Sequence, residues 1–282
     1  MAPATTREVL KYPKLAVEAL TLPDVEHIFN LTKTEDTNWT QLRAPFEITD
    51  YCNKILKEVD AAISRSNGRL DLVMKLRLEL RLELLLTAVY ATPPSPGSTP
   101  IPVSSKRPFL FEPVAYKEKV YCLQGTPDWF LWYCPDTKKE EESVAINLVI
   151  VVTEHGQSAD GVSRTLAYMA MIHTQRRAEG KADCLVFGLS TDNNQFHFLQ
   201  INDKGEASGS ELLGITEWSQ LVLNYFDHLQ EIVEKLAYFH KQASILSASD
   251  RSGETKKTHS VFHAGDCGIY ELIVTIKSRR LT

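Results

Sequence analysis

Residues 145–153 constrain the fold more than any other part of the chain, because they form its most β-branched run. Valine and isoleucine favour strands, and an apolar run without polar alternation is typical of a strand buried on both faces. We therefore expect this run to be a central strand of a sheet.

The patterns on either side of this run predict a mixed α/β domain. Further strands are expected at residues 119–123, 128–133, 183–189 and 196–201. Residues 162–177 place apolar side chains on one helical face, and Gly180 is a suitable stop for that helix. Residues 192–194 suit the turn of a hairpin. A crossover helix and a hairpin together imply a sheet with both parallel and antiparallel strands.

Helices are also expected outside this central series. Two precede it, one starting near Asp24 and one over residues 48–65, and a long one over residues 216–247 begins near Thr216 or Glu217. Residues 72–90 alternate apolar and charged side chains, as a strand would. Their length and their content of Leu, Arg and Glu favour a helix, and we predict a helix there.

Two segments lack the pattern of a packed element. Residues 92–113 contain seven prolines, and proline disrupts both helices and strand ladders, so a surface loop is expected. Residues 249–258 are polar, and a lone strand at residues 270–276 is followed by a basic end.

The composition is that of an ordinary globular protein and excludes few functions. The net charge of -5 argues weakly against nonspecific binding of polyanions, which needs clustered Lys and Arg. Five cysteines occur without a CxxC pair, so a zinc knuckle is not expected and reduced thiols are. No signal peptide or membrane-spanning run is predicted, and we expect an intracellular protein, cytoplasmic or nuclear.

Acidic residues at the ends of two predicted strands are the candidates for chemistry. Asp128 opens one strand and Glu154 closes the next, while Glu83, or Glu79 one turn earlier, lies on the helix before them. Carboxylates at neighbouring strand ends can hold a hard cation such as Mg²⁺ or Mn²⁺, which activates water for attack on a phosphoryl group. Carboxylates that simply face solvent at strand ends are the commoner case.

An ordered set of sequence blocks resembles the PD-(D/E)XK nuclease superfamily, in particular a nuclease-like family common in fungal genomes. The blocks, which span roughly residues 72–247, are residues 124–129, 147–154, 165–173, 176–181 running into 186–192, and 196–199. The resemblance implies a restriction-endonuclease-like core, a central mixed β-sheet flanked by helices in the order α-βββ-α-ββ-α. It also implies Asp128 and Glu154 as the motif carboxylates, with Glu83 as the helix carboxylate.

The chain departs from the family pattern where a lysine is expected two residues after the glutamate. Gly156 stands there, and glycine can neither position a water nor stabilise charge on a phosphoryl transition state. Arg164 occupies a position that usually carries glutamine, and it returns a positive charge to the site or is a plain surface cation. His155 should point away from the face that carries Glu154.

Two functions stay open from the sequence. One is a metal-dependent phosphodiester hydrolase on DNA or RNA, and the other is a catalytically impaired pseudo-nuclease that binds nucleic acid or protein. A third class, a structural or signalling partner protein, rests only on the N-terminal helices and the basic tail. A homodimer is a further open alternative, and no membrane partner is expected.

The expected organisation has three parts. Residues 1–70 form an N-terminal helical extension packed on the core, and residues 71–247 form the nuclease-like domain with its loop at 92–113. Residues 248–282 form a C-terminal tail.

Overall fold

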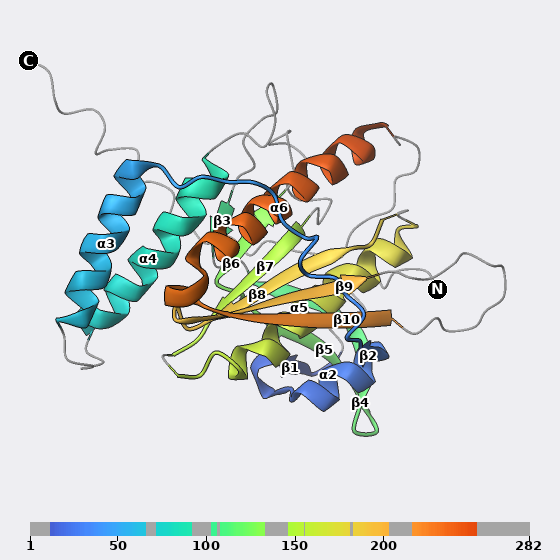
Figure 1. The fold of residues 1–282 in the computed structure, drawn as a ribbon. Coiled ribbons are helices and arrows are strands. Elements are labelled where there is room, and N and C mark those ends of the chain that lie inside the picture. The colour runs from blue at the N-terminus through green and yellow to red at the C-terminus, as the bar shows by residue number, and fades with distance from the viewer. Residues whose placement is uncertain are drawn as a thin grey trace, which may run out of the picture.

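The computed structural model describes residues 12–65, 72–91, 103–105, 108–132, 146–154, 156–180, 183–202 and 216–252. Within these ranges the chain is an α/β protein with a mixed sheet flanked by helices (Figure 1), as the sequence predicts. The lone strand expected at 270–276 lies outside the described residues.

A seven-stranded sheet forms the centre of the molecule, in the order β2-β10-β9-β8-β7-β6-β3. The strands are β2 (Leu31–Lys33), β3 (Val103–Ser105), β6 (Trp129–Trp132), β7 (Ile146–Val152), β8 (Val186–Thr191), β9 (Gln195–Asn202) and β10 (Thr216–Asn224). β7 pairs parallel with β8 and antiparallel with β6, and β8 and β9 form an antiparallel hairpin. The β-branched run of residues 145–153 therefore contains an inner strand of the sheet, as predicted.

Alternate side chains of β7 enter two different hydrophobic cores. Leu148 and Ile150 join the core under the helices α4 (Leu72–Tyr90) and α6 (Tyr225–Ser252). Val149 and Val151 join the core under α5 (Asp160–Ala178). This arrangement explains the unbroken apolar run, because a strand covered on both faces has no polar side.

A smaller three-stranded sheet, in the order β1-β5-β4, lies against the α5 side of the molecule. Its strands are β1 (Lys14–Ala16), β4 (Phe109–Tyr116) and β5 (Lys119–Gly125). β1 pairs parallel with β5, and β2 pairs parallel with β10, so the N-terminal segment contributes a strand to each sheet. It is not the purely helical extension that the sequence suggests.

The predicted helices are present, and the last of them begins later than expected, at Tyr225. They are α2 (Leu22–Phe29), α3 (Asp50–Ser64), α4, α5 and α6, and a short 3-10 turn, η1 (Val17–Ala19), follows β1. Residues 72–90 are helical, as predicted, although apolar and charged residues alternate along them. Gly180 takes a left-handed conformation with φ +71° just past α5, which confirms it as the stop.

Two predictions along the chain are wrong. Residues 216–224 were expected to start a helix but form β10, which pairs with β9 from Glu217 to Asn224. Part of the proline-rich segment, expected to be a loop, forms β3 and β4. Pro113 fits in β4 because this strand is at the edge of its sheet and its register shifts between Leu110 and Pro113. The element order consequently has more strands than α-βββ-α-ββ-α.

Among the helices of the described residues, none combines the length and the apolar character needed to span a membrane.

Candidate functional site

Asp128 is fixed against the last residues of β7. Its backbone N–H donates to the carbonyl of Ile150 at 3.1 Å, and its carboxylate Oδ2 accepts from the backbone N–H of Val152 at 2.8 Å. The side chain is half-buried. The antiparallel pairing of β6 with β7 thus puts this carboxylate at the end of β7, as the strand-end argument expects.

Glu154 follows at the same end of β7. β7 ends at Val152, and Thr153 donates its backbone N–H to the carbonyl of Thr191 at 2.8 Å, which continues the pairing with β8 by one bond. The side chain of Glu154 is exposed. Both motif carboxylates therefore lie at the end of β7. Asp128 is half-buried, and Glu154 faces solvent.

The helix carboxylates do not complete a metal site with them. Glu83 and Glu79 are both exposed on α4, whose Leu82 and Leu85 face the core. Within the described residues no three His, Cys, Asp or Glu side chains form a group that could hold a metal ion. Binding of Mg²⁺ or Mn²⁺ by Asp128 and Glu154 stays a prediction.

α4 sends a different charged side chain toward the sheet. Arg81 is 1% exposed; its guanidinium pairs with Asp60 at 3.1 Å and donates to the backbone carbonyl of Asn193 in the β8–β9 turn. It also lies over the ring of Tyr225, 4.0 Å from its centre. The ion pair with Asp60 compensates the buried charge, and we assign Arg81 to holding α4 against the sheet.

Arg164 and Asp128 both influence the pKa of one buried phenol, that of Tyr168 on α5. The Tyr168 hydroxyl donates to Glu18 Oε1 at 3.3 Å. Burial raises the pKa of Tyr168 well above its usual range, the Glu18 and Asp128 carboxylates raise it further, and Arg164 opposes them. The predicted cation and the predicted carboxylate thus lie on the same side of the molecule, around a side chain that the sequence did not single out.

Glycine at position 125 makes room for this phenol. A methyl group on Gly125 would collide with the Tyr168 hydroxyl. Gly125 ends β5, three residues before Asp128, so the glycine of the motif block has a packing role.

Gly156, in the place of the expected lysine, belongs to a turn and no longer to a strand. Its backbone has φ +79°, and its N–H donates to Asp192 Oδ2 at 2.8 Å. Among the residues that the structure describes, a Cβ at this position would meet nothing within 4 Å. Position 156 therefore offers open space and no functional group, and His155 beside it lies outside the described residues.

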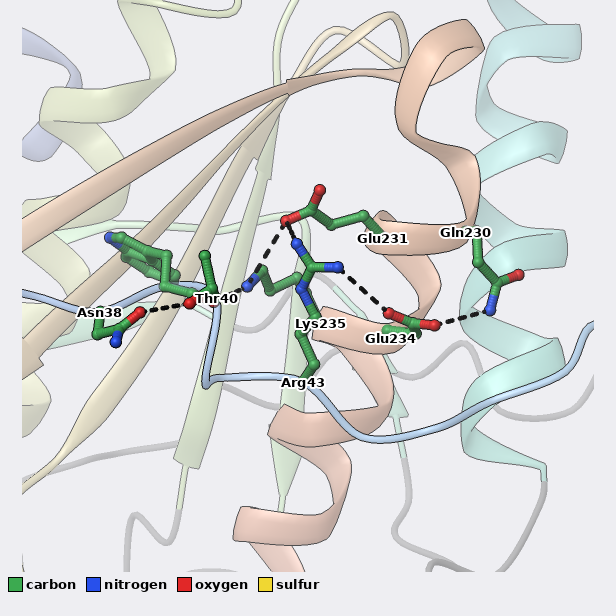
Figure 2. A network of polar contacts seen from close by, with 8 residues as sticks. Asn38, Thr40, Arg43, Gln230, Glu231, Glu234 and Lys235 are labelled. Atoms are coloured by element: carbon green, nitrogen blue, oxygen red, sulfur yellow. Dashed lines mark hydrogen bonds and ion pairs between the residues drawn. The ribbon is translucent and has the colours of Figure 1, made fainter.

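A second polar network, which the sequence did not predict, lies on α6 away from these residues (Figure 2). Arg43 pairs with Glu231 at 2.6 Å and with Glu234 at 3.8 Å, and the buried ammonium of Lys235 donates to the carbonyl of Trp39. Burial lowers the pKa of Lys235 to about 8, and Glu231 opposes this effect.

This network holds the segment of residues 38–46 on α6. Gln230 donates to the carbonyl of Phe46 at 2.7 Å, and Ala44 donates its N–H to the carbonyl of Glu234 at 3.1 Å. Trp39 and Phe46 pack on the core beneath. These contacts join residues 38–46 to α6, so we assign the network to structure.

The sequence analysis missed Tyr168, whose pKa Asp128 raises, and Glu18, which accepts a hydrogen bond from Tyr168. Tyr168 stood within a matched helix block, but nothing in the helical pattern distinguishes its hydroxyl from those of other core tyrosines. Glu18 comes from the N-terminal segment, and only the pairing of β1 with β5 brings it close.

No protein-family model matches this chain, and no curated protein matches it.

Proposed function

We propose that this chain is a catalytically impaired relative of the PD-(D/E)XK nucleases, a pseudo-nuclease that acts by binding and does not turn over phosphodiesters. The observation that carries the proposal is Gly156. A glycine in a left-handed turn, with its N–H directed to Asp192, supplies no charge to a phosphoryl group at the end of β7.

The carboxylates support the same conclusion. Asp128 and Glu154 both lie at the end of β7, but Glu83 and Glu79 do not join them in a three-ligand group. One oxygen of Asp128 already accepts a backbone hydrogen bond. Two carboxylates, one of them solvated, make a weak site for a cation that prefers six oxygen ligands.

The charge of the whole chain bears on the partner. A net charge of -5 gives no general attraction to a polyanion. We therefore favour a protein partner over DNA or RNA for this binding role.

The second candidate is a metal-dependent phosphodiester hydrolase on DNA or RNA, with Mg²⁺ or Mn²⁺ on Asp128 and Glu154. The observation in its favour is Arg164, which acts on the same phenol as Asp128 and brings a cation to this side of α5. In this candidate Arg164 replaces the missing lysine as the group that stabilises transition-state charge.

Calorimetry with Mn²⁺ and nuclease assays with DNA and RNA separate the two candidates. We expect little or no Mn²⁺ binding and no cleavage by the unmodified protein. Cleavage that disappears in Asp128→Ala and falls in Arg164→Gln would overturn the proposal and establish the hydrolase.

A pair of variants at position 156 tests the cause of the impairment. Gly156→Lys restores the family residue, and Gly156→Ala introduces the same backbone strain without the charge. Cleavage by the lysine variant alone would assign the loss of turnover to the missing cation.

A further inference from the structure

A buried histidine holds the loop that carries Glu154. His197 on β9 is 6% exposed, and its Nε2 lies 3.0 Å from the hydroxyl of Ser158, which is 3% exposed. On the other side of the ring, Gln220 Nε2 lies 2.7 Å from His197 Nδ1. The Ser158 hydroxyl also donates to Gln195 Oε1 at 3.0 Å.

These contacts suit one tautomer of the neutral ring. With the Gln220 amide nitrogen as the donor, His197 Nδ1 accepts, and the single proton of the neutral ring is on Nε2. Nε2 then donates to Ser158, whose own proton goes to Gln195. The pair is therefore not a nucleophile with its general base, because His197 has no acceptor directed at the Ser158 hydroxyl.

Ser158 connects the histidine to the candidate site. The loop between β7 and α5, residues 153–154 and 156–159, contains Glu154 and Gly156. The backbone carbonyl of Ser158 accepts from the Ser190 hydroxyl at 2.7 Å, and Gly156 donates its N–H to Asp192. Side chains from β8, β9 and the turn between them thus hold one short loop.

Protonation of His197 conflicts with this arrangement. A second proton on Nδ1 would face the donor of Gln220, and a positive charge would be buried at a place lined with neutral groups. Ser158, Gln195 and Gln220 carry no charge, and within the described residues Asp192 is the charged group that acts on His197. Burial outweighs Asp192 and lowers the pKa of His197.

We propose that His197 and Ser158 form a pH-sensitive latch, which holds the loop of Glu154 in place while His197 is neutral and releases it when His197 is protonated. Opening the loop exposes the ring to water, where the imidazolium is stable, so acid favours the open loop. The relevance of the latch to Glu154 as a binding residue rests on the proposed function, but the latch itself requires neither a cation nor a partner.

Hydrogen exchange of backbone amides in the full chain tests the latch. The protection of amides 156–160, corrected for intrinsic rates, is compared between about pH 7.5 and about pH 5, which bracket the ordinary histidine pKa of about 6.5. We expect the protection of these amides to be lower at the acid pH than at the neutral one. Amides of β7 should keep their protection.

Three variants separate the latch from other effects of acid. His197→Gln should show the same protection of the loop at both pH values. Gln220→Glu places a carboxylate at Nδ1, which favours the imidazolium in the closed loop, so it should suppress the acid response without removing the histidine. His228→Gln, at an exposed histidine of α6, should respond as the unmodified protein does.

The proposal is overturned if loop protection in the unmodified protein does not change, or if His197→Gln responds to acid equally. It is also overturned if the amides of β7 lose protection by the same factor as the loop. Because no metal or nucleic acid enters the measurement, its failure is distinct from a failure of the proposed function, which the Mn²⁺ titration decides.

Discussion

At the scale of single residues, the motif positions have unequal roles. Asp128 is held by two backbone hydrogen bonds, and Glu154 is exposed. The sequence analysis singled out both, because residue type and strand-end position are visible in one dimension. Tyr168 and Glu18 were not visible, because their importance depends on a contact between segments 150 residues apart.

Gly125→Ala tests the packing of this residue set. We expect the variant to lose about 1–3 kcal/mol of stability, the usual cost of overpacking, because its methyl group collides with the Tyr168 hydroxyl. Urea unfolding of Gly125→Ala, Tyr168→Phe and the double variant measures the coupling. Removing the hydroxyl should recover part of the loss, and strictly additive effects would show that Gly125 and Tyr168 do not interact.

At the scale of helices and strands, prediction succeeded where local and long-range preferences agreed. β7, β8 and β9 have apolar content for strands, and α5 ends at a glycine. In residues 216–224 the local and long-range preferences do not agree. Their sequence continues into α6 without a break, and they form a strand only because they pair with β9 and β2. β4 was hidden in the same way by Pro113, which is tolerated because of its edge position and the register shift.

Substitution of exposed β-branched residues by alanine checks the boundary between β10 and α6. Val222 is 49% exposed in β10, and Ile245 is 52% exposed in α6. Val222→Ala should lower stability by about 0.5–1 kcal/mol, because alanine is a poor strand former. Ile245→Ala should raise it by a few tenths of a kcal/mol, because alanine is the best helix former. Thermal unfolding of both variants gives the signs, and a gain in Val222→Ala would contradict the strand.

At the scale of the whole molecule, the sheet joins two cores that respond to acid through different histidines. His197 lies on the α5 side, within the latch. His240 on α6 is 2% exposed in the other layer, with its ring edge-on to Tyr90 at 4.8 Å between centres. Burial lowers the pKa of His240 to about 4. Acid should therefore act locally through one histidine and globally through the other.

The folded chain binds a proton at His240 less readily than the unfolded chain, whose histidine pKa is about 6.5. Below that pH the unfolded state takes up the proton first, so stability is fully present above it and is lost as pH falls toward about 4. Between about pH 7 and about pH 5 this one group should remove about 2 kcal/mol. His240→Phe keeps a ring against Tyr90 and does not titrate, so urea unfolding should show a loss smaller by that amount.

The same variant distinguishes the two histidines. If the latch is local, His240→Phe should leave the acid response of amides 156–160 intact while it flattens the global unfolding profile. His197→Gln should abolish the acid response of the loop amides. It should change the global unfolding profile less than His240→Phe does, since the His197 ring is released by opening of the loop alone. An equal effect of both variants on both measurements would mean that the two layers of the sheet open together, and that acid unfolds this chain as one unit.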